Sequence, residues 1–312
     1  MQASKRALWP AGMAATVLVF AGMSAGMSAG MSTEMFAGAG QVAAQAAGPA
    51  RTPEVPPGRA EATSLPARPH TPRSGFHFMG RELQAMQRDD ASNPGMLWVQ
   101  EGLQLWSRPE GLQQQACAGC HGASPQVSMR DAAARHPAWD PASQRPVTLA
   151  GRIVQCRARH QGLGPSTPGA SDAVLALETA VAHASRGLPV TPMVTPAVSS
   201  AAGGGMQTWL ARGATLWQQR IGQLNLSCAQ CHDERPGQRL GGALIPPGNA
   251  AGYPTYRLEW QAVGPLTRRL RNCMTGVRAE PYAPGSDESL ALQVYMAWRD
   301  RGLAVETPAV RP

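Results

Sequence analysis

Aromatic and charged residues are scarce in this chain of 312 residues. Phe, Trp and Tyr together make up 5% of it, and charged residues make up 15%, against about 25% in an ordinary globular chain. This length suits two domains better than one, and so few aromatic side chains are not enough for two ordinary cores. We therefore expect that a cofactor fills part of the interior.

Lysine is almost absent, because Lys5 is the single Lys among 28 basic residues. The formal net charge is +8, but no stretch interleaves basic with aromatic residues. This pattern argues against nucleic-acid binding. Glycine and proline are abundant by contrast, with 34 and 28 residues. We therefore expect long Gly/Pro-rich loops between the regular elements.

The first 46 residues are typical of a targeting segment. Lys5 and Arg6 precede an uncharged apolar run, and Ala44-Gln45-Ala46 has the A-x-A pattern of a cleavage site. The run is too poor in Leu and Ile to predict a stable membrane span, with an uncleaved anchor as the alternative. Residues 47–90 are rich in Pro and Ala, which predicts an extended tether. We expect a cleaved signal peptide over residues 1–46 and a periplasmic protein.

Four of the six cysteines lie in two copies of C-x-x-C-H, the attachment sequence of c-type haem. In this chemistry both sulfurs become thioethers and the histidine ligates iron. A zinc ribbon or a redox-active cysteine pair is the alternative, but zinc would need both pairs in one cluster, and they stand 111 residues apart. We predict two covalently attached haem c groups. Their ligating residues are Cys117, Cys120 and His121 for the first haem, and Cys228, Cys231 and His232 for the second.

The surroundings of the two motifs repeat, which indicates two domains of one kind. Gly102, Leu105 and Trp106 recur 111 positions later as Gly213, Leu216 and Trp217. Apolar residues at helical spacing predict an amphipathic helix before each motif. Downstream, Ser171 and Ser286 suit the N-caps of two terminal helices, and Gly187 and Gly302 suit the residues that end them.

This order of elements, with a helix, a haem motif, loops and a terminal helix, is that of a cytochrome c. The chain is predicted to be mainly α, with two tandem cytochrome c-like domains and long Gly/Pro-rich loops. We place the first domain at residues 91–192, a linker at 193–206 and the second domain at 207–312.

Cys156 and Cys273 are the two cysteines outside the motifs. Each follows an arginine by four residues, Arg152 and Arg269 respectively. A disulfide between them is the ordinary alternative in an exported protein, but their equivalent places in the repeat argue against it. In a cytochrome c the second axial ligand comes from the interval between the haem motif and the last helix, where both residues lie. Each is a candidate distal ligand of its own iron.

Methionine and histidine are the alternative distal ligands. The residues concerned are Met129, Met193, Met274, Met296, His136, His160 and His183. No two methionines occupy equivalent positions in the repeat, Met296 falls on an apolar helix face, and the second half has no histidine besides His232. A thiolate ligand would lower the reduction potential relative to methionine, which argues against a simple electron shuttle.

Around Cys273 the sequence resembles the SoxA family of dihaem cytochromes c. The string from Arg269 to Tyr282 carries the resemblance, above all its C-x-x-x-x-R-A-x-P-Y segment, and the likeness spans Pro94 to Val305. In that family the dihaem subunit forms a heterodimer with the monohaem cytochrome SoxX and couples periplasmic thiosulfate to a cysteine of the carrier SoxYZ. The resemblance implies an L-cysteine S-thiosulfotransferase in which Cys273 is the active-site cysteine, able to carry an extra sulfur, and Cys156 is the distal ligand of the first haem.

The residues near Cys273 suit this chemistry. Joining the outer sulfur of thiosulfate to a carrier thiol makes an S–S bond and releases two electrons, so the site needs a reactive sulfur and an electron acceptor. Thiosulfate is a dianion, and Arg269, Arg271 and Arg278 lie within five residues of Cys273. Cys273, Arg269 and Arg278 are the candidate catalytic residues, with haem-propionate binding as the alternative for the arginines. The alternative for the whole chain is a non-catalytic dihaem electron-transfer cytochrome.

Overall fold

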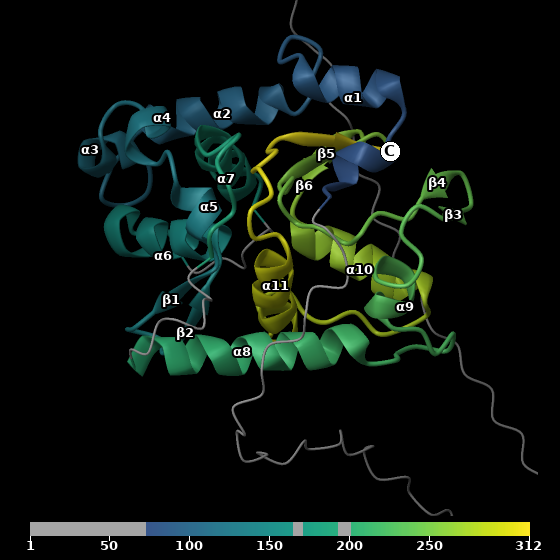
Figure 1. The fold of residues 1–312 in the computed structure, drawn as a ribbon. Coiled ribbons are helices and arrows are strands. Elements are labelled where there is room, and N and C mark those ends of the chain that lie inside the picture. The colour runs from purple at the N-terminus through teal and green to yellow at the C-terminus, as the bar shows by residue number, and fades with distance from the viewer. Residues whose placement is uncertain (1–72, 165–170, 193–200) are drawn as a thin grey trace, which may run out of the picture. The chain divides into compact units, whose positions relative to one another are not determined.

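The computed structural model describes residues 73–164, 171–192 and 201–312, which form two similar, mainly helical halves (Figure 1). The predicted signal peptide lies outside these residues. The first half contains the 3-10 helix η1 (Gly75–Phe78), helices α1 (Arg81–Arg88), α2 (Met96–Ser107), α3 (Cys117–His121), α4 (Pro125–Ser128) and α5 (Ala132–Arg135), strands β1 (Ala138–Asp140) and β2 (Arg145–Val147), and helices α6 (Leu149–Gln161) and α7 (Asp172–Ala184). The second half contains α8 (Ala201–Gln218), α9 (Cys228–His232), strands β3 (Arg239–Leu240), β4 (Ala243–Leu244), β5 (Thr255–Arg257) and β6 (Ala262–Gly264), helices α10 (Leu266–Gly276) and α11 (Asp287–Arg299), and strand β7 (Ala309–Arg311).

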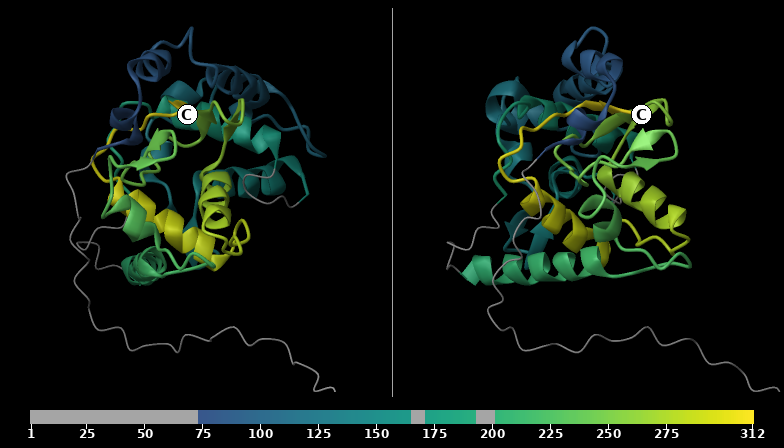
Figure 2. Two further views of the ribbon diagram at one scale, coloured as in Figure 1. Left: turned by 90° about the vertical axis from the view of Figure 1, so that its right-hand side faces the viewer. Right: turned by 45° about the vertical axis from the view of Figure 1, so that its right-hand side comes forward.

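Each half is built on one crossing of its first and last long helices. Helix α2 packs against α7, and α8 packs against α11 (Figures 1 and 2). A Cβ atom at Gly102 would collide with the carbonyl oxygen of Ala176, and one at Gly213 would collide with that of Ala291. Only glycine therefore allows these close approaches, and the recurrence of Gly102 as Gly213 reflects the same crossing in both halves.

A short antiparallel hairpin precedes the helix that carries each remaining cysteine. Strands β1 and β2 lead into α6, and β5 and β6 lead into α10. At the turns, Gln144 and Gln261 take the same left-handed conformation, with φ of 52° and 49°. Cys156 and Cys273 are then the eighth residues of α6 and α10. The structure thus confirms that these cysteines occupy equivalent positions.

The two halves interlock through matching contacts. The segment after α7 pairs with the segment after α11, since Val190 N–H donates to Leu303 O at 2.8 Å and Val305 N–H donates to Leu188 O at 2.9 Å. Trp98 of α2 packs against a residue of the other half's hairpin, Tyr256, with ring centroids 6.2 Å apart. Helix α8 packs in turn against β1 and β2 of the first half. The two halves therefore contact each other through side chains as well as through backbone hydrogen bonds.

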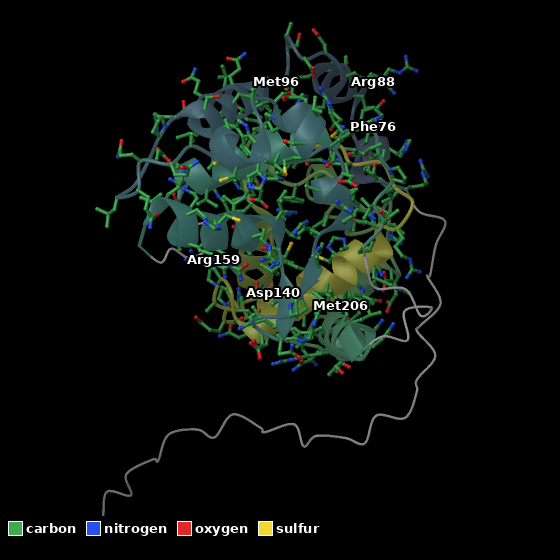
Figure 3. The ribbon with its side chains drawn as sticks, turned by 90° about the vertical axis from the view of Figure 1, so that its left-hand side faces the viewer. Phe76, Arg88, Met96, Asp140, Arg159 and Met206 are labelled. Carbon is green, nitrogen blue, oxygen red and sulfur yellow. The ribbon has the colours of Figure 1, made fainter. Side chains whose placement is uncertain are left out.

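Two predicted boundaries differ from the structure. Residues 73–90, expected to be part of the tether, contain η1 and α1. They are ordered because Leu83 and Met86 pack against a cluster containing Val310. Arg88 of α1 also lies over the ring of Phe76, 4.7 Å from its centroid (Figure 3). Helix α8 begins at Ala201, inside the predicted linker 193–206.

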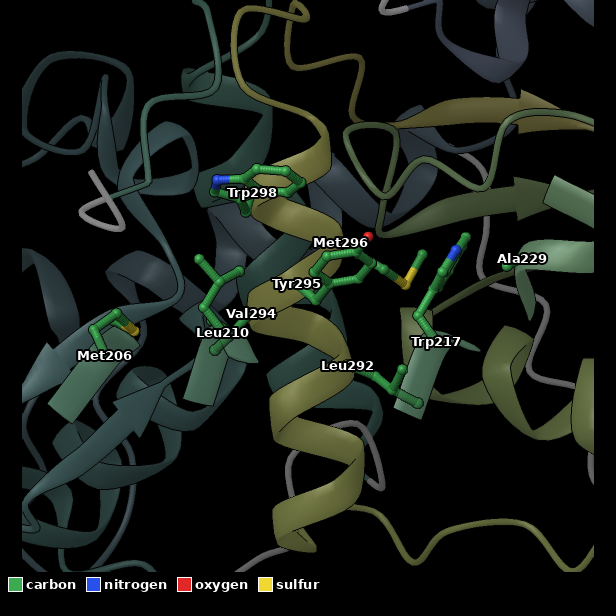
Figure 4. Close-up of a cluster of buried hydrophobic side chains, with 9 residues drawn as sticks. All are labelled: Met206, Leu210, Trp217, Ala229, Leu292, Val294, Tyr295, Met296 and Trp298. Carbon is green, nitrogen blue, oxygen red and sulfur yellow. The ribbon is translucent and has the colours of Figure 1, made fainter. Parts of the chain in front are cut away.

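The core of the second half lies between α8, α9 and α11 (Figure 4). Trp217, Tyr295 and Met296 are buried there, with the rings of Trp217 and Tyr295 5.8 Å apart. Burial of Met296 agrees with its expected place on an apolar helix face. In the first half, Leu105, Trp106 and Leu177 form a comparable cluster. Within the described residues, the structure has no helix that is both long enough and apolar enough to cross a bilayer.

Candidate functional site

The first C-x-x-C-H motif forms α3, a single helical turn beside a cavity of about 150 Å³. Its Cys117, Cys120 and His121 line the cavity together with Cys156 from α6. Leu177 and Val181 of α7 supply part of an apolar wall. Three of the alternative distal ligands of the first half also line this cavity, namely Met129, His136 and His160. His183 does not line it. Met193 lies outside the described residues.

The second motif forms α9, whose start is fixed by a capping box. Ser227 Oγ accepts from Gln230 N–H at 3.2 Å, and the Gln230 side chain accepts from Ser227 N–H at 2.9 Å. Cys228 and His232 line a second cavity of about 150 Å³ with Cys273 from α10. Cys231 lies half-buried on the same helical turn, outside the lining. Met296 also lines this cavity, whereas Met274 is buried away from it.

His232 has the orientation and the protonation state that a metal ligand needs. Its Nδ1 donates to Pro246 O at 2.7 Å, because a carbonyl oxygen can only accept. This hydrogen bond leaves Nε2 as the free lone pair. Burial lowers the pKa of His232, which favours the neutral imidazole that ligates metals. The same geometry of indole and imidazole occurs in both halves, with ring centroids 5.8 Å apart for Trp106–His121 and Trp217–His232.

The six cysteines all have free thiols, so no disulfide joins Cys156 to Cys273. Each of the two instead lies near the first cysteine of its own motif, since Cys156 acts electrostatically on Cys117 and Cys273 acts on Cys228. Burial raises the pKa of Cys117, and it raises the pKa of Cys228 to about 12. The pairing of each outlying cysteine with its own motif is the arrangement expected for two distal ligands.

The candidate arginines separate into two groups. Arg269 lines the second cavity beside Cys273, and its guanidinium is 3.7 Å from Glu259 Oε1. Arg278 is exposed with φ of 56° and lies outside the residues that line the cavity. Arg271 is also exposed. The structure therefore brings Arg269 to Cys273 and does not bring Arg278 there, and a catalytic role for either residue stays a prediction.

Three residues at the second cavity were not singled out from the sequence. Arg257 of β5 and Arg311 of β7 reach it from strands, and Tyr253 reaches it from the loop before β5. Arg257 Nε is 2.7 Å from Glu259 Oε1, the same carboxylate oxygen that Arg269 approaches. The single carboxylate of Glu259 therefore pairs with both guanidinium groups. Burial raises the pKa of Tyr253, which keeps its phenol protonated. Tyr253 stands 117 positions after His136, as Cys273 does after Cys156, so the repeat itself contained the signal for it.

The residues around both cavities fit a covalently attached haem. Each cavity has a C-x-x-C-H turn on its wall, apolar side chains around it and a further thiol from a second helix. In the second half the hydrogen bond to Pro246 already orients the imidazole. Imidazole and thiolate are both donors that haem iron takes in proteins.

Fold and cavities together define a tandem cytochrome c. A family model described as SoxA/TsdA, cytochrome c domain, matches residues 101–190 and 212–305, and the chain belongs to this family. A cytochrome c domain binds haem c, which decides between the haem and zinc interpretations of the motifs. The two matched segments also confirm the prediction of two tandem, mainly α domains.

Similar proteins agree with this assignment. The chain is 37% identical to the L-cysteine S-thiosulfotransferase subunit SoxA of Pseudaminobacter salicylatoxidans, over 76% of this chain and 80% of that protein. It is 34% identical to the subunit of the same name from Rhodovulum sulfidophilum, over 77% and 80%. The crystal structure of SoxXA from P. pantotrophus superimposes with a TM-score of 0.70 at 30% identity, covering 77% of this chain and 86% of that chain.

Proposed function

We propose that this chain is a periplasmic dihaem cytochrome c that couples thiosulfate to a cysteine of a carrier protein, as an L-cysteine S-thiosulfotransferase. The relatives named L-cysteine S-thiosulfotransferase subunit SoxA support this activity. The observation that carries it is the placement of Cys273 at the cavity of Cys228 and His232, with Arg257 and Arg269 on the same wall. Guanidinium groups beside a thiol suit the binding of a dianionic substrate.

The proposal assigns one haem c to each half. Cys117 and Cys120 would attach the first, and His121 and Cys156 would ligate its iron. Cys228 and Cys231 would attach the second, and His232 and Cys273 would ligate its iron. When bound, the haem supplies an electron acceptor next to the sulfur of Cys273.

The protein's own groups would bind and orient the substrate. Thiosulfate carries two negative charges, and Arg269 and Arg257 present guanidinium groups with one carboxylate, Glu259, between them. Charge-assisted hydrogen bonds from such groups hold oxyanions firmly. The outer sulfur of thiosulfate would then meet Cys273 or a sulfur that it carries.

The overall reaction balances as a two-electron oxidation. A carrier thiol and thiosulfate form one S–S bond. The thiol releases one proton, and the two reactants together release two electrons. Those electrons need an onward acceptor. We propose a SoxX-like monohaem cytochrome in a heterodimer, which the similarity to the SoxXA structure supports, and a SoxYZ-like carrier that delivers the thiol at Cys273.

Paired cysteine variants test this function. In steady-state thiosulfate oxidation with carrier and acceptor supplied, Cys273→Ala should reduce the rate at least about a thousandfold, as expected when a residue that acts covalently is removed. Cys156→Ala, the matched control, should keep the rate within about tenfold. A mass spectrum of each holoprotein should still count two haems. Wild-type rates in Cys273→Ala would refute the assignment of Cys273 as the active-site cysteine, and equal losses in both would place the first haem on the catalytic path.

A further inference from the structure

A buried ion pair lies on the His232 side of the second cavity. The Arg299 Nη2 atom is 2.7 Å from Asp233 Oδ1, and the two side chains are only 6% and 11% exposed. The same Nη2 donates to Pro247 O at 2.9 Å. Burying two charges costs several kcal/mol per ion, so a fold keeps such a pair where it serves something besides stability.

The pair connects the segments that meet at His232. Asp233 directly follows His232, and its Oδ2 accepts from Trp217 Nε1 at 2.8 Å. Arg299 lies over the indole of Trp217, 4.4 Å from the ring centroid, and Trp217 in turn packs on the imidazole. Through Pro247, Arg299 also holds the residue next to Pro246, the acceptor for His232 Nδ1. One guanidinium thus fixes three neighbours of the imidazole.

The first half has no counterpart of this pair. By the offsets of the repeat, Gly122 stands where the second half has Asp233, and Ala184 stands where it has Arg299. Trp106 Nε1 donates instead to the backbone oxygen of Gly122, at 2.9 Å. Indole and imidazole nevertheless keep the same distance and the same angle of 38° in both halves. Packing of the histidine therefore does not require the charges.

We propose that Asp233 and Arg299 are positioning residues that set the ferric–ferrous balance of the haem bound through Cys228 and Cys231. This inference rests on the proposed function, which assigns a haem to the second half. Arg299 contacts Trp217 and Pro247 beside His232, and its charge cancels that of Asp233, the residue next to this histidine. Removing one charge leaves the other uncompensated in a low-dielectric interior. A lone Asp233 favours ferric iron, and a lone Arg299 favours ferrous iron.

Two nearly isosteric variants test this directly. Spectroelectrochemical titration of the holoprotein should resolve two one-electron waves. Arg299→Met should shift the second wave toward ferric iron by at least tenfold in the equilibrium, which is about 59 mV downward for one electron. Asp233→Asn, which keeps an oxygen for Trp217 Nε1, should shift the same wave by a similar amount in the opposite direction. The wave of the first haem should not move in either variant.

A third variant separates charge from packing. Arg299→Lys retains the cation, although without the planar fork, and should keep the second potential closer to the wild-type value than Arg299→Met does. Unchanged second potentials, or shifts of equal sign in Arg299→Met and Asp233→Asn, would overturn the proposal. Loss of the second haem from all three variants would assign the pair to folding and would overturn it as well. A wild-type peptide with Cys228 and Cys231 free of haem would instead refute the proposed function.

Discussion

The two halves of the chain hold the same motif on the same helix crossing but surround it differently. In the first half His121 is exposed, and glycine and alanine occupy the places behind it. In the second half His232 is half-buried, bonded to Pro246 and backed by the ion pair of Asp233 and Arg299. The distal sides differ too, because strands β5 and β7 bring Arg257 and Arg311 to the second cavity only.

This difference shows where a duplicated fold has become specialised. The glycine crossing, the hairpin turns and the positions of the outlying cysteines are shared, and these features build the scaffold. Arg152 and Arg269 are shared as well, since each lines the cavity of its own half, but the ion pair of Asp233 and Arg299 and the arginines from β5 and β7 occur at the second cavity alone among the described residues. We infer that polar groups around the second cavity serve chemistry, because buried charges are retained at a cost to stability.

The shared scaffold gives the largest expected effect. Gly102→Ala and Gly213→Ala should each lower the free energy of unfolding by about 3 kcal/mol, because the added Cβ meets a backbone carbonyl that cannot move aside. Urea unfolding followed by circular dichroism measures the loss. Gly276→Ala is the control, since its Cβ position has no atom within 4 Å apart from the adjoining residues and the backbone of its own helix. A loss in only one of the two halves would show that the crossings are not equivalent.

The next largest effect is expected for the arginines that line the cavities with Cys156 and Cys273. Arg269→Ala should raise the KM for thiosulfate about a hundredfold, about 2.7 kcal/mol, because it removes a guanidinium from the wall that holds Cys273. Arg152→Ala, at the equivalent place in the first half, should leave KM unchanged. Steady-state kinetics with saturating carrier and acceptor gives both values. Equal effects would mean that both arginines act on the haems rather than on the substrate.

Much of the scaffold could be predicted from the sequence because it depends on local or repeated patterns. The C-x-x-C-H turns, the helices before them and the equivalence of Cys156 and Cys273 all follow from spacing along the chain. Helix α11 begins at Asp287, as Ser286 predicts, and Gly302 takes a left-handed conformation after it. Such features need no knowledge of which distant segments meet.

The remaining parts depend on contacts between distant segments. Arg311 joins Arg257 at the second cavity because β7 pairs with β5 in parallel. The ordering of residues 81–88 likewise requires that pairing, since Gln87 accepts from Val310 N–H at 3.1 Å. Arg278 lies close to Cys273 in sequence, yet its left-handed backbone and exposed side chain separate it from the cavity. Proximity along the chain was a poor guide there.

A third comparison concerns equivalent positions 178 and 293, which both line a larger cavity of about 380 Å³ between the halves. Burial raises the pKa of Glu178 to about 7, and its Oε2 atom has no hydrogen-bond partner. The folded state therefore keeps its proton at a pH where the unfolded state has lost it. The free energy of unfolding should fall as the pH rises from about 4.5 to about 7.

The Glu178→Gln variant should remove this pH-dependent fall in the free energy of unfolding. We expect the variant to be more stable than wild type by about 2 kcal/mol at pH 8 and equally stable at pH 4. The reverse exchange, Gln293→Glu, should introduce a similar cost in the second half. Urea unfolding at both pH values measures these differences. Equal stabilities of wild type and Glu178→Gln at pH 8 would show that the carboxylate is solvated in the folded protein.

The smallest expected effect concerns the caps of the terminal helices. Ser286 Oγ accepts from Ser289 N–H at 3.3 Å, whereas the Ser171 side chain makes no capping hydrogen bond. Ser286→Ala should therefore lower the free energy of unfolding by about 1 kcal/mol, and Ser171→Ala should change it by less than about 0.5 kcal/mol. Urea unfolding of both variants at neutral pH is the measurement. Equal losses would mean that Ser171 caps α7 in solution, and the terminal helices would then begin in the same way in both halves.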